Sequence, residues 1–147
     1  MAIEGEKSIE VEAPVAEVWA VLRDIDSYPE WQSGVKEVEV IERHEDGGPL
    51  VAETVQDAQV KTVRFRLRYE IDAPKRITWT YEKGDVKDFS GHWLLEKVSA
   101  KRTKVTLRLN VDPGRMLGML LRGPVVDRVR DHSLGGTLKE LKAHVER

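Results

Sequence analysis

A run of alternating apolar and charged residues between positions 60 and 71 constrains the fold of this chain more than any other feature. Apolar side chains occupy every second position and charged ones stand between them: Val63, Phe65, Leu67, Tyr69 and Ile71 alternate with Arg64, Arg66, Arg68 and Glu70. Successive residues of a strand point to opposite faces of a sheet. The run therefore predicts a strand, Val60–Ile71, in an antiparallel sheet with one face in water and one face covered.

Shorter runs of the same kind predict about six more strands. They are Ser8–Glu12, Val35–Ile41, Leu50–Gln56 and the runs at 77–81, 89–95 and 105–111. Most are separated by short turns, which is typical of an antiparallel meander. The first connection differs, because Pro14–Asp24 has helical apolar spacing and a second short helical turn follows it before Trp31.

The segment Pro124–Val145 predicts one long helix that covers the apolar face of the sheet. At about 100° per residue it carries two apolar stripes, one of Leu134, Leu138, Leu141 and Val145 and the other of Val125, Val129, Gly136 and Ala143. A row of mostly small or polar residues lies between them: Val126, Arg130, Ser133 and Thr137.

Two interpretations of this middle row stay open. A helix on a solid core would carry leucines there, so a polar row between apolar stripes indicates the inner wall of a cavity. Alternatively, Arg130 reaches solvent at the rim, and Ser133 and Thr137 hydrogen-bond to carbonyls of their own helix.

Length and composition narrow the function. At 147 residues we expect one domain, 1–147, with a core large enough to hold an internal pocket. The charged fraction is 34% with a net charge of −2, so no basic excess points to nucleic acid. Cysteine is absent, and neither a secretory signal nor an apolar run of membrane-spanning length is visible. We expect a cytoplasmic protein without stable membrane insertion.

Several blocks of the sequence resemble the START-like (Bet v 1-like, helix-grip, SRPBCC) superfamily, and in particular its polyketide cyclase/dehydrase and coenzyme Q-binding type. The blocks are Ile9–Pro14 with the following Glu17–Trp19, Asp24–Trp31, Gly91–Trp93, and Thr103–Val111 running into the long helix. The resemblance covers essentially the whole chain. It implies an α+β helix-grip fold: a curved antiparallel sheet of about seven strands around a long C-terminal helix, with short helices after the first strand.

The resemblance also implies a deep apolar pocket between the sheet and the C-terminal helix, with Trp31 and the Gly123–Pro124 region near its mouth. Combined with the inward faces of the strands and the middle row of the helix, it gives a set of candidate lining residues. The candidates are Trp31, Glu53, Phe65, Leu67, Tyr69, Trp79, Tyr81, Trp93, Leu120, Val126, Arg130, Ser133 and Thr137. Arg130 needs an acceptor if it faces the sheet, and Glu53 is its natural partner if the Val51–Val55 face is inward.

The other features of the sequence give weaker indications of function. No histidine spacing fits a metal site, and we expect neither a metal nor a cofactor; His132 should lie on the flank of the helix, toward its charged side. Gly135–Gly136 indicates either a hinge or a close approach of helix and sheet. The apolar segment Met116–Leu121 before Pro124 is either a lid, a membrane-touching lip or ordinary packing over the mouth.

The main functional hypothesis is a binding or transport module for a lipophilic molecule such as a lipid, quinone or polyketide. An aromatase/cyclase-type enzyme acting on a polyketide chain is the alternative. It is disfavoured because no histidine or carboxylate pair points clearly inward, so no catalytic residue is assigned. A protein that modulates another macromolecule is a third possibility. We expect a monomer or a weak homodimer.

Overall fold

A computed structural model describes residues 3–58, 61–121 and 123–147 of the chain. Seven antiparallel strands form one sheet in the order β1-β7-β6-β5-β4-β3-β2. The strands are β1 (Ile3–Val11), β2 (Val35–Arg43), β3 (Pro49–Asp57), β4 (Thr62–Asp72), β5 (Arg76–Gly84), β6 (Asp88–Ser99) and β7 (Arg102–Asp112). The predicted strand count and antiparallel arrangement are confirmed. Val60, the predicted first residue of the fourth strand, lies outside the described residues.

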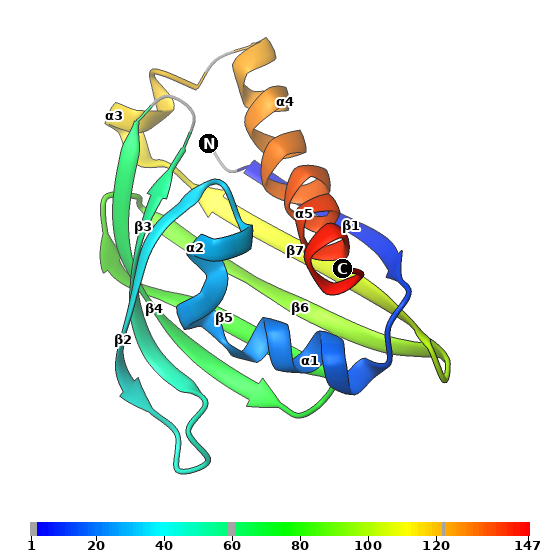
Figure 1. Cartoon of the computed structure of the whole chain (residues 1–147). Helices are drawn as coiled ribbons and strands as arrows, with labels where there is room; N and C mark the ends of the chain where they lie inside the picture. The colour runs from blue at the N-terminus through cyan, green and yellow to red at the C-terminus, as the bar shows by residue number, and fades with distance from the viewer. Residues whose placement is uncertain (1–2, 59–60, 122) are drawn as a thin grey trace.

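The helices lie on one side of this sheet, which curves around them (Figure 1). They are α1 (Val15–Arg23), η1 (Ile25–Ser27) and α2 (Tyr28–Trp31) after the first strand, then α3 (Gly114–Gly118), α4 (Pro124–Asp131), η2 (His132–Gly136) and α5 (Thr137–Val145). The helix-grip α+β architecture expected from the sequence is therefore the fold observed. Within the described residues, no helix combines the length and apolar character needed to span a membrane.

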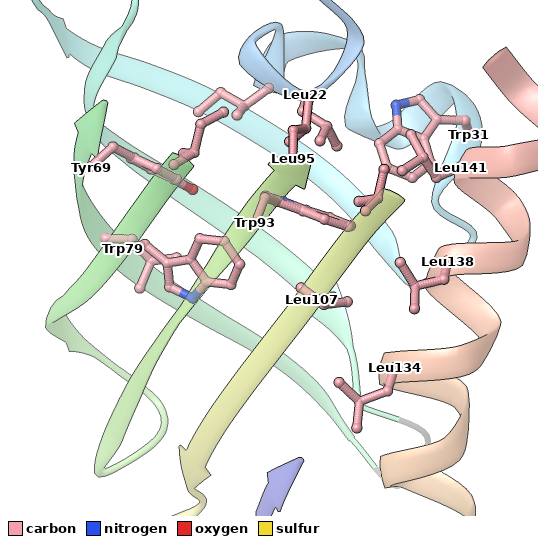
Figure 2. Packing of buried hydrophobic residues seen from close by; sticks show 14 of the residues in the cluster. Leu22, Trp31, Tyr69, Trp79, Trp93, Leu95, Leu107, Leu134, Leu138 and Leu141 are labelled. Atoms are coloured by element: carbon pink, nitrogen blue, oxygen red, sulfur yellow. The ribbon is translucent and has the colours of Figure 1, made fainter. Parts of the chain in front are cut away.

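On β4, the buried residues are the ones that the alternating sequence pattern predicts. Val63, Phe65, Leu67 and Tyr69 are buried on the concave face, while Arg64 and Arg68 are exposed on the other. The same period continues through Trp79, Trp93 and Leu107 on the next strands, which point into the core beside Leu134, Leu138 and Leu141 of the helix (Figure 2).

The C-terminal helical run is interrupted by one π-helical turn, η2, between α4 and α5. A π turn hydrogen-bonds i to i+5 and is wider than an α turn. The side chains of α4, which precedes this turn, are therefore rotated around the helix axis by about 100°, the angle of one residue, from their positions on a regular helical wheel. Leu134, Leu138 and Leu141 are buried as predicted, but α4 has no buried residue.

Gly135–Gly136 does not make the close approach to the sheet. A Cβ on Gly135 would meet only the side chain of Lys7, with Nζ at 3.3 Å and Cδ at 3.7 Å, and one on Gly136 would meet only atoms of its own helical run. The close approach is on the strand side instead, because a Cβ on Gly5 of β1 would lie 2.4 Å from Cδ1 of Leu134. The glycine that brings helix and sheet together is therefore Gly5.

Candidate ligand-binding cavity

A cavity of about 150 Å³ lies between the concave face of the sheet and the helices. The sheet supplies most of its wall, through Ile3, Gly5, Thr54, Gln56, Val63, Phe65, Leu67, Tyr69, Trp79, Phe89, Trp93, Leu107, Leu109 and Val111. The helices and the segments beside them close it with Tyr28, Gln32, Leu117, Leu121, Val129, Arg130, His132, Ser133, Leu134 and Thr137. The wall is mostly apolar, with polar groups at a limited number of positions.

Eight of the thirteen predicted lining residues lie on this wall. They are Phe65, Leu67, Tyr69, Trp79, Trp93, Arg130, Ser133 and Thr137. The wall positions follow directly from strand alternation on β4 to β6 and from the middle row of the helix. Whether these side chains contact a ligand stays a prediction.

Glu53 is on the opposite face of the sheet, and the predicted Glu53–Arg130 pair does not form. Its carboxylate accepts hydrogen bonds from Arg64 Nη1 at 3.1 Å and Arg66 Nη2 at 3.0 Å. The inward face of β3 is carried by Ala52, Thr54 and Gln56. Alternation in β3 was ambiguous because apolar residues occur at both parities.

Arg130 adopts the rim arrangement. Its aliphatic stem packs near Gly5 on β1, while Nη1 donates to Oδ1 of Asp127 at 3.2 Å on the surface. The Nε atom is buried and has no hydrogen-bond partner among the described residues. Arg130 can therefore meet a polar group of a ligand at the edge of the cavity rather than in its interior.

Trp31 and Tyr81 are next to the cavity but do not line it. Trp31 is buried between α2 and α5, where its ring stacks on His144 with centroids 6.0 Å apart, and Tyr28 takes the place on the wall. The hydroxyl of Tyr81 is turned away to the carbonyl of Val86, at 2.5 Å.

Leu120 and Val126 are also absent from the cavity wall, although Val126 packs against the hydrophobic core. Leu120 is 53% exposed, and its neighbours Leu117 and Leu121 are the buried lining residues of this segment. Val126 is replaced on the wall by Val129, because the π turn rotates α4 relative to the ideal wheel.

The same rotation brings His132 to the cavity wall, where the sequence placed it on the flank. Its Nε2 is 3.8 Å from the position of a Cβ on Gly34, which lies just before β2. The signal that could have located it is the Gly135–Gly136 pair, since two adjacent glycines weaken the α-helical preference of the turn.

Two phenols on the wall are held in the neutral form. Burial raises the pKa of Tyr69 well above its ordinary value, and a hydrogen bond with Thr54 offsets part of this. Burial and the neighbouring Tyr69 raise the pKa of Tyr28, whose hydroxyl donates to the carbonyl of Leu22 at 2.6 Å. Neither phenol can act as a base near neutral pH.

An aromatic group forms one side of the cavity. Ring centroids are 5.1 Å apart for Phe65 and Phe89, 6.2 Å for Trp79 and Phe89, and 6.5 Å for Trp79 and Trp93, with edge-to-face angles. A Cβ on Gly91 would collide with the indole of Trp79 at 2.7 Å, so this glycine leaves the space that the ring occupies. Trp79 Nε1 is buried without a partner among the described residues.

The described part of the chain holds no group of three or more His, Asp or Glu side chains placed to bind a metal ion. The polar wall can donate and accept hydrogen bonds, and His132 can also exchange a proton. The arrangement therefore fits binding of an apolar molecule that carries some polar atoms.

Comparisons with known proteins agree with this architecture. The family model described as polyketide cyclase / dehydrase and lipid transport matches residues 11–135. A comparison with curated protein sequences gave no match.

Among solved structures, a START superfamily protein from Mycobacterium smegmatis has a TM-score of 0.85 at 21% identity, covering 97% of each chain. The Zhui aromatase/cyclase from a Streptomyces species has a TM-score of 0.84 at 21% identity, over 100% of this chain and 95% of that one. At these identities the likeness shows the fold alone. The di-domain ARO/CYC BexL from the BE-7585A biosynthetic pathway is 28% identical with a TM-score of 0.72, over 97% of this chain and 46% of that chain.

Proposed function

Since the chain belongs to the polyketide cyclase / dehydrase and lipid transport family, we propose that it binds a lipophilic small molecule in the cavity between the sheet and the C-terminal helix. The observation that carries the proposal is the cavity itself, which is mostly apolar and has an aromatic side. Burial of apolar ligand surface would drive binding, at about 25 cal/mol per Å².

The volume of the cavity limits what fits without rearrangement. A cavity of about 150 Å³ is comparable to one that accommodates a benzene-sized molecule. A cavity of this volume therefore has room for one ring or a short chain. A larger lipid, quinone or polyketide must extend past the rim at Arg130 or displace the segment that carries Leu117 and Leu121.

A cyclase-type enzyme is the second candidate, and one observation favours it. His132 is on the cavity wall, which weakens the argument against catalysis drawn from the lack of an inward histidine. It could move a proton to or from a bound carbon chain, and the neutral phenol of Tyr69 could donate a hydrogen bond to a carbonyl oxygen. Binding stays the primary proposal, because the mostly apolar wall supports it directly, whereas catalysis by His132 would also need a second group oriented to exchange a proton with it.

A pair of variants on α4 tests the binding proposal. Val129 lines the cavity and α4 has no buried residue, so Val129→Trp should place an indole in the cavity at little cost in stability. Arg128→Trp puts the same side chain on the exposed face of the same helix. Native mass spectrometry with organic extraction would detect a co-purifying apolar molecule, and calorimetric titration with m-xylene would measure binding of a defined probe.

We expect the parent chain and Arg128→Trp to bind m-xylene with similar affinity, and Val129→Trp to lose at least tenfold. Equal binding by both variants, or no binding by any of the three proteins, would contradict a ligand site in this cavity.

A further inference from the structure

The segment between β7 and α4 presents two adjacent apolar side chains to solvent. Met119 is 59% exposed and Leu120 is 53% exposed, whereas Leu117 and Leu121 of the same segment are buried on the cavity wall. Among the described residues, the other exposed large apolar side chains stand alone on β2 and β6. Single exposed apolar residues are normal on a protein surface, but an adjacent pair on one turn is a candidate contact site.

The backbone of this turn is already paired at its exposed tip. Three consecutive N–H groups donate to carbonyls three or four residues earlier: Met119 to Arg115 at 3.2 Å, Leu120 to Leu117 at 3.0 Å and Leu121 to Gly118 at 3.2 Å. A backbone that enters the edge of a lipid layer must satisfy its polar groups internally, because acyl chains offer them no partner. These three N–H groups meet that condition.

The charge of the segment is positive. From position 113 to 126 the sequence contains Arg115 and Arg122 and neither Asp nor Glu, although the chain has 26 acidic residues. The carboxylates at its two ends are engaged, since Asp112 accepts a backbone N–H at 3.0 Å and Asp127 pairs with Arg130 at 3.2 Å. An apolar pair close to an exposed arginine fits a surface with acyl chains beneath anionic headgroups.

The position of the segment leaves it free to meet a flat surface. Figure 1 shows α3 at one end of the molecule and the β6–β7 turn at the other. On the sheet beside α3, the Cβ of Lys87 is 3.6 Å from the position of a Cβ on Gly114. Lys87 and the next residue, Asp88, are both exposed and have opposite charges. Arg115 therefore sets the sign of the charge beside the apolar pair.

The size of the exposed pair decides between a lipid surface and a protein partner. A stable protein–protein interface buries about 800 Å² on each partner around an apolar core. Two apolar side chains and one arginine provide much less than this. A lipid layer needs no complementary shape, and each inserted apolar side chain or cation near anionic headgroups adds to the affinity.

We propose that Met119 and Leu120 insert into the headgroup region of a membrane that contains anionic lipids, and that Arg115 pairs with those headgroups. The contact is peripheral and reversible, because only two apolar side chains enter the lipid. It places the part of the cavity wall formed by Leu117 and Leu121 next to the membrane surface. This docking function goes beyond ligand binding in the cavity and does not depend on it.

Flotation with lipid vesicles tests the proposal. The vesicles are an equal mixture of phosphatidylcholine and phosphatidylglycerol, or phosphatidylcholine alone, and the proteins are the parent chain, Met119→Ser, Leu120→Ser and Val98→Ser. Val98 is the matched control, because it is an apolar side chain with 49% exposure on β6. We expect each segment variant to bind the mixed vesicles about tenfold more weakly than the parent, and Val98→Ser to bind like the parent.

The headgroup contact has its own test. Arg115→Gln should weaken binding to the mixed vesicles about fivefold at low salt. The difference from the parent should disappear in about 1 M salt, where the screening length is only about 3 Å. Lys101→Gln, which removes an exposed cation at the β6–β7 turn, should bind like the parent at both salt concentrations.

The chain has no cysteine, so one introduced cysteine accepts a single environment-sensitive fluorophore such as NBD. On Leu120→Cys the label should brighten when mixed vesicles are added, and on Val98→Cys it should not. A parent chain that binds neither kind of vesicle would overturn the proposal and leave a protein as the partner of the exposed pair. Unchanged binding by Met119→Ser and Leu120→Ser, or equal brightening at both labelled positions, would also overturn it, because the contact would then lie elsewhere.

Discussion

Gly5 on β1 sets how closely the C-terminal helix lies against the sheet. In Gly5→Ala the new methyl would stand 2.4 Å from Cδ1 of Leu134, a side chain that is only 3% exposed and cannot move freely. Overpacking of a core costs about 1–3 kcal/mol. Alanine has less conformational entropy than glycine in the unfolded chain, and this difference offsets only about 0.4–1 kcal/mol of that cost. We expect Gly5→Ala to lower the free energy of unfolding by about 1–2 kcal/mol in urea denaturation.

Glu6→Ala, at the exposed neighbouring position, is the matched control for this experiment and should change stability by less than about 0.5 kcal/mol. A Gly5→Ala chain as stable as the parent would mean that Leu134 has free space to move into, contrary to its burial.

The ion pairs of Glu53 predict a pH dependence on the outer face of the sheet. Hydrogen bonds from Arg66 and Arg64 hold the pKa of this carboxyl below its usual range. A lowered folded-state pKa contributes stability above the unfolded pKa of about 4.3, and the contribution disappears as the pH falls through the folded pKa. Glu53→Gln should therefore cost about 1 kcal/mol at pH 7 and progressively less below about pH 4.

Urea denaturation of the parent and Glu53→Gln chains at several pH values would measure this difference. A stability gap that stays constant from pH 7 to pH 3 would show that the charge of Glu53 is not its source.

Glu53 also marks a limit of sequence reasoning at the level of single residues. On β4 the alternation of apolar and arginine positions is unambiguous, and Phe65, Leu67 and Tyr69 could be placed on the inner face. On β3, Val51 and Val55 suggest one parity while Ala52 and Thr54 occupy the other. The register decides, because Glu53 pairs directly with Arg66 and so shares its outward face. Strand pairing is a long-range contact, so the sequence of one strand alone does not reveal it.

At the scale of elements, the π turn η2 explains the two errors on the C-terminal helical run, Val126 and His132. A wheel with a constant angle predicts Val126 on the cavity wall and His132 on the flank. With the wider turn, Val129 takes the place of Val126 on the wall, and His132 joins it there. A sequence pattern gives periodicity but not the local winding of a helix, so this shift could not be calculated in advance.

The glycines of η2 should be replaceable at a gain in stability. Neither Gly135 nor Gly136 would bring a Cβ closer than 3.3 Å to another group, and that nearest group is the mobile end of Lys7. Alanine is favoured over glycine in a helix by about 1 kcal/mol. We expect Gly136→Ala to raise the free energy of unfolding by about 0.5–1 kcal/mol. The reverse change at the exposed Ala143, Ala143→Gly, should lower it by a similar amount.

Thermal or urea denaturation would show whether Gly136→Ala raises the free energy of unfolding and Ala143→Gly lowers it. A destabilised Gly136→Ala chain would indicate that the π turn itself, rather than the space around it, requires glycine.

The segment after β7 separates an inner from an outer apolar face. Leu121 is 3% exposed and lines the cavity, whereas Leu120 is 53% exposed. Leu→Ala in a core costs about 2–5 kcal/mol, with the lower end for a site that borders an existing cavity. We expect Leu121→Ala to cost about 2 kcal/mol and Leu120→Ala less than about 0.5 kcal/mol in urea denaturation. Equal costs would mean that both leucines are packed in solution.

At the scale of the molecule, the order of strands and helices could be predicted from local periodicity, and the helix-grip fold from the resemblance to the START-like superfamily. The cavity could be predicted only in outline. One apolar sheet face needs a cover, and the polar row of the helix pointed to a space beneath it. The exact wall depends on Gly5 and Gly91, where the missing side chain leaves room for Leu134 and Trp79, and on η2, where the helix departs from regular winding.

Because the cavity wall draws on every strand from β3 to β7 and on β1 and the C-terminal helix, a bound ligand should stabilise the whole fold. A ligand at ten times its Kd adds about 1.4 kcal/mol to the free energy of unfolding. For a chain of this length that corresponds to a rise in Tm of about 3–6 °C. We expect this rise, followed by circular dichroism, when m-xylene is added to the parent chain at ten times its measured Kd. Val129→Trp, with the cavity filled, should show no rise at the same concentration. An equal rise in both proteins would mean that m-xylene binds at some other surface, because the indole of Val129→Trp fills the cavity.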